Sequence, residues 1–270
     1  MSRYLKKQLT ILIVFLLIIL AVGFGIYFLI NPVGKETCFD GIQNQSEEGI
    51  DCGGPCGPCR KKPDKPLQIL SQSFIPTLEN NFDLVGKIEN PNTDWGVESV
   101  VYRFSLYDEN NQLIGSLEGN TYLLPQEIKY IVEQRFYAIN PPSRISLEIK
   151  NLKWQRFQDF EELQLKVKDK SHQLVDGKYQ LSGDIENKST YNLDRVEIIG
   201  LLFDEEQNII AAGKTNINTF VMNETRYFEI NWPDQISKEV FSSEIKTYTN
   251  VFLDDNFMRV HGSKEKFQEY

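Results

Sequence analysis

Tyr107-Asp-Glu-Asn-Asn-Gln-Leu-Ile114 has a close counterpart 96 residues later in the chain, Phe203-Asp-Glu-Glu-Gln-Asn-Ile-Ile210. A second pair of segments, Leu84-Val-Gly-Lys-Ile-Glu-Asn90 and Leu181-Ser-Gly-Asp-Ile-Glu-Asn187, matches in the same order and at nearly the same offset. Ordered matches at a nearly constant spacing indicate an internal duplication. We therefore expect two copies of one domain, at residues 67–157 and 161–258.

Apolar and polar residues alternate within each copy. Val101-Tyr-Arg-Phe-Ser-Leu-Tyr107 follows this pattern, and Val196-Glu-Ile-Ile-Gly-Leu-Leu-Phe203 follows it less strictly. A period of two is typical of half-buried strands, and turn-forming segments such as Asn90-Pro-Asn92 separate them. The pattern predicts an all-β fold of two tandem immunoglobulin-like antiparallel β-sandwiches. We interpret the aromatic residues as core and sheet-face packing rather than as a ligand box; they are Phe82, Phe104, Tyr107, Phe136, Trp154, Tyr179, Phe203, Phe220, Tyr227, Phe228 and Trp232.

Phe104-Ser-Leu-Tyr-Asp108 spells the F-x-L-Y-D motif, and the copy that contains it resembles the FxLYD family of predicted β-sandwich domains. In that family a strand ends in an acidic turn and the next strand begins with apolar residues, as Leu113 and Ile114 do here. The second copy departs from the motif, since Gly200-Leu-Leu-Phe-Asp204 has glycine at the family's phenylalanine position. The resemblance implies sandwich domains of extracytoplasmic microbial proteins and assigns no activity to any residue.

An uncharged run precedes the two copies. Residues 9–30 include 17 that are Leu, Ile, Val or Phe. As a helix the run would be about 33 Å long, enough to cross a hydrocarbon core of about 30 Å. Three basic residues precede the run and one follows within 20 residues, which predicts a cytoplasmic segment 1–8 and places residues 31–270 outside the plasma membrane. A cleaved signal peptide is the alternative, but its apolar core is usually about 7–15 residues and no Ala-x-Ala pattern follows here.

A cysteine-bearing module is expected at residues 36–59, followed by a polar, proline-containing linker at 60–66. All four cysteines lie within it: Cys38, Cys52, Cys56 and Cys59. The module is rich in Gly and Pro and has too few large apolar residues to hold a core. Two disulfides are the first expectation outside the cytoplasm, with three connectivities open. A zinc site is an alternative, although the spacing lacks paired C-x2-C knuckles, and unpaired or redox-active thiols are a third.

Oxygen-bearing side chains in this module raise the question of calcium. Asp40, Asn44, Glu47 and Asp51, with Glu48 beside them, lie at the short, irregular spacing that suits a hard cation. A solvated acidic loop with local Asx turns is the alternative, and we favour it. The stretch from Cys38 to Cys59 also resembles a small motif of secreted and surface-anchored microbial proteins, C-x-D-G-x-x-N-x-x-E-x-G-x-D-C-G-G-x-C-x-x-C. That resemblance implies an extracytoplasmic location and no activity.

Charge and motifs argue against two classes of function. The formal net charge is -9, and the chain beyond residue 30 carries -12, which disfavours binding to nucleic acid. His172 and His261 stand beside no nucleophile motif, and no phosphate loop, dinucleotide fingerprint or H-E-x-x-H motif is present. We expect a protein that is not an enzyme, with no cofactor other than the candidate calcium ion, and a polar tail at 259–270.

The leading hypothesis is a single-pass membrane protein, held by residues 9–30, whose two sandwiches project as a rod and meet a protein partner. The rival is an extracytoplasmic module that binds a small ligand or glycan, or a component of a cell-surface or secretion assembly. A concave aromatic cleft on or between the sandwiches would favour the ligand module. An open apolar edge strand would favour protein assembly.

Overall fold

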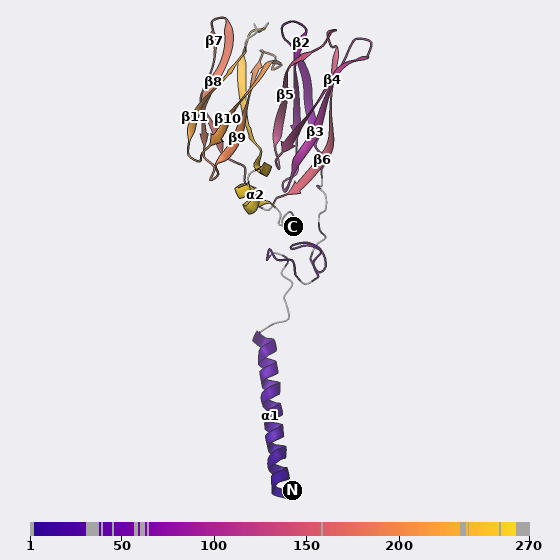
Figure 1. Cartoon of the computed structure of the whole chain (residues 1–270), viewed down its shortest axis with the longest axis vertical. Coiled ribbons are helices and arrows are strands. Elements are labelled where there is room, and N and C mark those ends of the chain that lie inside the picture. Colours follow the sequence, from indigo (N-terminus) through magenta and orange to yellow (C-terminus); the bar gives the residue numbers. More distant parts are fainter. Residues whose placement is uncertain are drawn as a thin grey trace. The chain divides into compact units, whose positions relative to one another are not determined.

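Antiparallel β-sheets make up most of the protein, as the sequence predicts (Figure 1). The structure is a computed structural model. It describes residues 3–30, 38, 40–44, 46–56, 59, 63, 65–157, 159–232, 236, 238–253 and 255–262. The chain divides into two compact units, residues 1–61 and 62–270, and each is described by itself. Much of the predicted linker, residues 60–62 and 64, and most of the predicted tail, residues 263–270, lie outside the described residues.

The first unit begins with the helix α1 (Arg3–Ile30), which is 28 residues long. The segment contains no proline and is rich in leucine, one of the stronger helix formers. The described apolar side chains of α1, such as Ile11, Leu16 and Phe24, are exposed rather than packed into a core. Within the described residues, no helix combines the length and the apolar character that a membrane crossing requires.

The first copy, called repeat 1 below, consists of two three-stranded sheets, ordered β1-β2-β5 and β4-β3-β6. Its strands are β1 (Gln68–Pro76), β2 (Asn81–Glu89), β3 (Trp95–Tyr107), β4 (Leu113–Leu123), β5 (Ile128–Tyr137) and β6 (Arg144–Arg156). One buried core draws residues from both sheets, including Leu84 and Ile88 of β2, Phe104 of β3 and Leu147 of β6. The period-two pattern of the sequence therefore has its physical basis in this core, which takes every second side chain of a strand.

The second copy, repeat 2, has the same arrangement of sheets, ordered β11-β8-β7 and β10-β9-β12. Its strands are β7 (Leu165–Val175), β8 (Lys178–Asn187), β9 (Leu193–Phe203), β10 (Ile209–Phe220), β11 (Thr225–Asn231) and β12 (Ser242–Thr249). Its core includes Leu181, Ile185, Ile198 and Phe228. Equivalent strands also pair in equivalent register, because Gly86 lies opposite Ile131 in repeat 1 and Gly183 lies opposite Phe228 in repeat 2.

The repeated sequence motifs have local structural roles. Asp108 Oδ1 accepts the backbone N–H of Gln112 at 2.8 Å, and Asp204 Oδ1 accepts that of Asn208 at 2.8 Å. The acidic residue after each strand therefore closes a turn. Asn90 and Asn187, which end the repeated Ile-Glu-Asn segments, are fully buried, and each amide donates to two backbone carbonyl groups.

Glycine at position 200 departs from the F-x-L-Y-D motif for a packing reason. A Cβ atom added to Gly200 would lie 2.7 Å from Leu181 Cδ2 and 2.8 Å from Ile230 Cδ1, with Trp232 next in line at 3.5 Å. These three side chains belong to the core of repeat 2. They occupy the space into which a phenylalanine would project. In repeat 2, these neighbouring side chains therefore fill the place that Phe104 fills in repeat 1.

The two repeats pack side by side through a buried apolar contact (Figure 1). The sheet β1-β2-β5 of repeat 1 contributes Ile75, Val85, Tyr130 and Val132, and the sheet β10-β9-β12 of repeat 2 contributes Ile199, Leu201, Ala212 and Tyr248. The predicted rod of two projecting sandwiches is therefore corrected. This contact also explains the weaker alternation of 196–203, because β9 is buried on both faces and such strands read as continuous apolar runs.

A smaller apolar cluster joins the end of repeat 1 to the C-terminal part of the chain. Phe157 packs with Phe252 of the 3-10 helix η1 (Val251–Leu253) and with Phe257 of α2 (Asp255–His261). Phe157 also forms an isolated β-bridge with Gly262. The segment predicted as a polar tail from residue 259 thus begins inside a packed helix, because the buried side chains of α2 complete this cluster.

Candidate functional site

A cleft of about 610 Å³ opens between the two repeats, beside their apolar contact. Strands β3, β4 and β5 line it from repeat 1, and β9, β10, β12 and the segment of η1 line it from repeat 2. Four tyrosines contribute to the lining: Tyr102, Tyr122, Tyr130 and Tyr248. None of the aromatic residues that the sequence assigned to packing lines this cleft, and most of them lie in or against the two cores.

Side chains of repeat 2 satisfy the backbone of the edge strand β5. The N–H of Tyr130 donates to Tyr248 Oη at 3.0 Å, and Tyr248 Oη donates to the carbonyl oxygen of Ile128 at 3.4 Å. Lys214 Nζ donates to the carbonyl oxygen of Val132 at 2.7 Å. An uncovered edge would offer these groups to another chain. The contact between the repeats therefore closes the β5 edge with side chains instead of a further strand.

Lys129 of β5 is only 2% exposed, although its side chain ends in an amine. Its Nζ lies 3.2 Å from the ring centroid of Tyr122 and 4.8 Å from that of Tyr248. Within the described part of the chain, Nζ has no hydrogen-bond partner. Cation–π contacts stabilise a desolvated cation by about 2 kcal/mol, whereas the burial of an unpaired ion costs several kcal/mol. Lys129 is therefore incompletely satisfied by the protein.

Two carboxylates determine the electrostatics around Lys129. Burial lowers the pKa of Lys129, and the nearby charges of Glu127 and Glu197 oppose that shift. Burial raises the pKa of Glu127, whose Oε2 accepts the N–H of Leu124 at 2.8 Å. Glu197 lies directly opposite Tyr248 in the β9–β12 pair, so both side chains occupy the same face of the sheet. Glu197 makes no hydrogen bond or ion pair with any residue that the structure describes, and its charge acts on Lys129.

The cation at the equivalent position of repeat 2 has different partners. Lys129 lies opposite Ile88, and Arg226 lies opposite Ile185, the matching residue of the second copy. Arg226 Nε is 2.7 Å from Glu224 Oε1, and the guanidinium also donates to two backbone carbonyl groups at 2.7 and 2.8 Å. The duplicated scaffold therefore pairs its cation fully in repeat 2 and leaves it unpaired at the cleft in repeat 1.

A second polar group crosses the cleft. The hydroxyl of Tyr102 donates to Glu133 Oε1, and Glu133 Oε2 lies 3.9 Å from Lys214 Nζ of repeat 2. Burial raises the pKa of Tyr102 well above its ordinary value, and the hydrogen bond to Glu133 adds to the shift. Tyr102 therefore stays protonated and neutral over the physiological pH range, and Glu133 links the two repeats.

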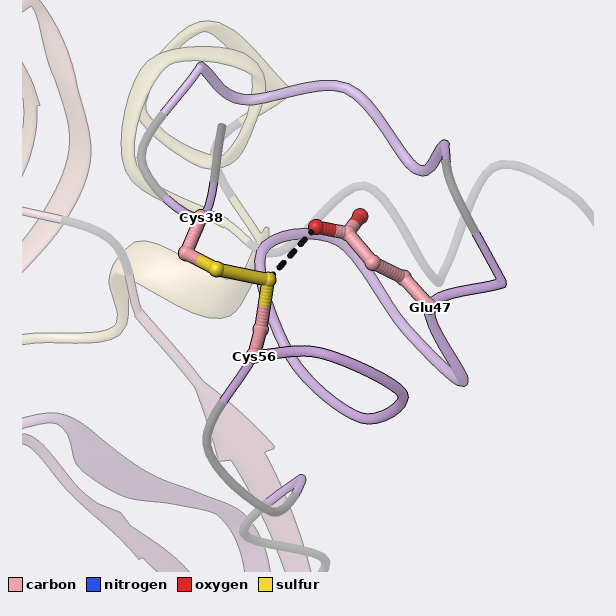
Figure 2. A group of neighbouring side chains, drawn as sticks. All are labelled: Cys38, Glu47 and Cys56. Atoms are coloured by element: carbon pink, nitrogen blue, oxygen red, sulfur yellow. Dashed lines mark hydrogen bonds between the residues drawn. A yellow bond between two sulfur atoms is a disulfide. The ribbon is translucent and has the colours of Figure 1, made fainter. Parts of the chain in front are cut away.

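In the first unit, disulfides join Cys38 to Cys56 and Cys52 to Cys59, which selects one of the three predicted connectivities. No thiolate of these four residues is left to bind zinc. Figure 2 shows the carboxylate of Glu47 directed at the first disulfide, with Oε1 3.1 Å from Cys56 Sγ. A disulfide sulfur has no proton to donate, so this is a close contact and not a hydrogen bond.

The four candidate calcium ligands lie in one loop, and their carboxylates bind the backbone. Asp51 accepts the N–H groups of Asp40 and Gly41 at 3.0 to 3.1 Å. Glu47 Oε2 accepts the N–H groups of Asn44 and Asp51 at 3.1 and 3.2 Å. These contacts are those of acidic turns, which the sequence offered as the alternative. Calcium binding stays a prediction.

Neither histidine belongs to the cleft. His261 is buried, with Nδ1 2.9 Å from the carbonyl oxygen of Asp159 and Nε2 3.1 Å from Tyr191 Oη, so both ring nitrogens have partners. His172 Nδ1 lies 3.2 Å from Ser243 Oγ on an exposed surface. A catalytic serine needs a base that a third group orients, and no group among the described residues orients the His172 ring in this way.

None of the protein-family models searched matches the chain, and no curated protein shows significant similarity to it. Lys129 is not among the residues predicted from the sequence. A signal was available, because Leu124-Pro-Gln-Glu-Ile-Lys129 and Val221-Met-Asn-Glu-Thr-Arg226 place a basic residue two positions after a glutamate in both copies. The burial of only one of the two cations depends on the packing of the repeats, which the pattern does not reveal.

Proposed function

We propose that this chain is a non-enzymatic binding module displayed outside the cytoplasm, with the cleft between the repeats as its ligand site. Lys129 carries the proposal, because it lines the cleft and its buried amine has no acceptor among the described residues. In repeat 2 the equivalent cation, Arg226, is paired with Glu224. A concave cleft lined by tyrosines is also the feature that distinguishes the ligand module from its rival.

Attachment to a membrane through residues 9–30 is the second part of the proposal. Its support is the apolar, uncharged sequence of this run and the basic residues before it. Disulfides in the following segment are typical of an oxidising exterior. Since no described helix qualifies as a membrane crossing, the attachment requires a direct experiment.

We also propose that each repeat is an immunoglobulin-like sandwich of the FxLYD type. Two antiparallel three-stranded sheets share one apolar core in each repeat, which supports the proposal. The turn role of Asp108 and Asp204 matches the acidic turn of that family. The proposal concerns fold and location, since the family offers no activity to transfer.

A structural or protein-interaction role is the second candidate. The edge strand β1 supports it, because Ile69 and Leu70 are exposed near its start. An extended segment of a partner could pair with this edge. Against it, β1 has a bulge between Ile69 and Ser71, and Pro76 ends the strand. Both features discourage pairing with another chain.

The ligand site can be tested with the full chain in detergent and its Lys129→Met variant. Each would be incubated with a small-molecule extract of the native cells, re-purified, and analysed by mass spectrometry. We expect a compound that is enriched on the unmodified chain and not on the variant. Absence of any Lys129-dependent compound would contradict the proposed site. A protein captured equally by both would favour the second candidate.

The proposed location can be tested on intact cells. An impermeant amine- or carboxylate-directed label should modify the exposed surface of the repeats without permeabilisation. Labelling that requires permeabilised cells would show that the repeats lie inside and would contradict the proposed orientation.

A further inference from the structure

The hydrogen-bonding groups at the cleft constrain what it can hold. Lys129 lines the cleft, and its buried Nζ has three donor positions and no acceptor among the described residues. Glu197, which is half-buried, also lines the cleft, and no described side chain or backbone group donates to its carboxylate. Glu197 lies beside Tyr248, and the Tyr248 ring is 4.8 Å from Lys129 Nζ. A ligand that satisfies both side chains must accept a hydrogen bond at one atom and donate one at a nearby atom.

The charge of the lining disfavours strongly anionic ligands. Seven charged side chains line the cleft, four acidic and three basic: Glu98, Glu133, Asp194, Glu197, Lys129, Arg195 and Lys214. The lining is therefore slightly negative when all are ionised. Part of the positive charge is already used, since Lys214 lies 3.9 Å from Glu133 and also donates to the backbone of Val132. The positive charge of Lys129 would attract a phosphate or a dicarboxylate, but Glu197 and the other acidic side chains of the lining would repel it.

Neighbouring hydroxyl groups on a neutral molecule fit this arrangement. A hydroxyl oxygen can accept from Lys129 Nζ, and the adjacent hydroxyl can donate to Glu197. Bonds of this kind to a charged partner are roughly twice as strong as neutral ones. The volume of about 610 Å³ lies within the usual range for small-molecule sites, about 300–1,000 Å³, and can hold one or two sugar rings.

We propose that the cleft between the repeats binds a neutral polyhydroxylated ligand of the sugar class, with Lys129 as hydrogen-bond donor and Glu197 as acceptor for neighbouring hydroxyl groups. The inference rests on the proposed ligand-binding function. It adds the chemical class of the ligand and the two residues that recognise it. Tyr122 and Tyr248 hold the Lys129 side chain in place through their ring faces.

Calorimetric titration of the full chain in detergent tests this inference. The probes are five neutral sugars, namely glucose, galactose, N-acetylglucosamine, maltose and cellobiose, and three controls, namely acetate, inorganic phosphate and glycine. We expect at least one sugar to saturate the protein. Lys129→Met and Glu197→Gln should each lower the affinity for that sugar at least tenfold. Lys87→Met is the matched control. Lys87 Nζ also lies over a tyrosine ring, 5.1 Å from the ring centroid of Tyr130, but Lys87 does not line the cleft.

The outcomes separate the inference from the function on which it rests. Failure of all five sugars to bind, or sugar binding that neither cleft variant weakens, overturns the sugar proposal. Binding of acetate, phosphate or glycine that Lys129→Met abolishes, without sugar binding, also overturns it but leaves the cleft as a ligand site. Thermal unfolding of each variant shows whether it is folded, and Glu197→Gln provides an answer should Lys129→Met fail to fold.

Discussion

The two repeats share one topology, and they differ most on the faces that meet. On the sheet of repeat 1 that contacts repeat 2, Val85 and Val132 are buried, whereas the equivalent positions of repeat 2 hold Ser182 and Glu229. The reverse holds on the other sheet, where repeat 2 buries Ile199 in the contact and repeat 1 has Arg103 at that position. At these matching positions, the apolar residue lies on the face that the other repeat covers.

The polar and apolar positions explain why the two copies form a closed pair. A contact between unlike faces could continue from copy to copy and form a filament. Here the two free faces carry polar residues at the matching positions, so the contact ends after two copies. The same asymmetry buries Lys129 and leaves Arg226 in an ion pair at the protein surface.

The largest expected effect comes from giving repeat 1 the residue of repeat 2. Val132→Glu places a carboxylate in the buried contact, where it has no partner. We expect a loss of about 3 kcal/mol or more in the free energy of unfolding, because the charge is uncompensated. Denaturant unfolding of the full chain in detergent measures it. The reciprocal variant, Glu229→Val, changes an exposed position and should shift stability by less than about 0.5 kcal/mol. Equal effects of the two would contradict the asymmetry.

A smaller effect is expected from the hydroxyl that closes the β5 edge. Tyr248→Phe leaves the N–H of Tyr130 without its acceptor, at a cost of about 1–3 kcal/mol. Tyr227→Phe is the control, because the Tyr227 hydroxyl is exposed and contacts only another exposed side chain, Glu229. Matching thermal shifts for the two variants would mean that the Tyr248 hydroxyl does not hold the repeats together.

The two cations should respond with opposite signs when each is replaced by methionine. Lys129→Met removes a buried amine without a hydrogen-bond partner and should leave stability unchanged or raise it by about 1 kcal/mol, since the burial of an unpaired ion costs several kcal/mol. Arg226→Met removes a partly exposed ion pair and two hydrogen bonds, and should lower stability by about 1 kcal/mol. A clear loss with Lys129→Met would show that its cation–π contacts are sufficient without a ligand.

The smallest effect concerns alkaline pH. The pKa of Lys129 is lowered in the folded protein, so above that value the unfolded chain binds more protons than the folded one. The contribution of Lys129 to the free energy of unfolding should therefore rise with pH, up to the pKa of lysine in the unfolded chain, about 10.4. Comparison of unfolding between pH 7 and 10 in the unmodified chain and Lys129→Met isolates this slope. Identical slopes would show that Lys129 does not carry a lowered pKa.

Much of the fold of the repeats could be predicted from short-range patterns. The repeated Leu-x-Gly-x-Ile-Glu-Asn segments indicated equivalent strands, and the acidic turns at Asp108 and Asp204 separated them, because both features depend on local backbone chemistry. The presence of disulfides followed from a module too small for a core. Their pairing did not, because it depends on which turns bring the sulfur atoms together.

The site was not predictable, because it arises between the repeats. Lys129 has an ordinary place in its own strand, and Tyr248 lies 119 residues further along the chain. The weak alternation of 196–203 was the one sequence sign of a second buried face, and it could not say which surface covered that face. The prediction of a rod failed for this reason.

The backbone amide of Tyr130 reports on whether the two repeats pack against each other. Its N–H points away from its own sheet and has an acceptor only because Tyr248 of repeat 2 lies against it. Hydrogen exchange on the full chain should show this amide strongly protected, comparable to amides inside the sheets. Fast exchange at Tyr130 beside slow exchange elsewhere in β2 and β5 would mean that the repeats do not pack as described, and the cleft would not exist.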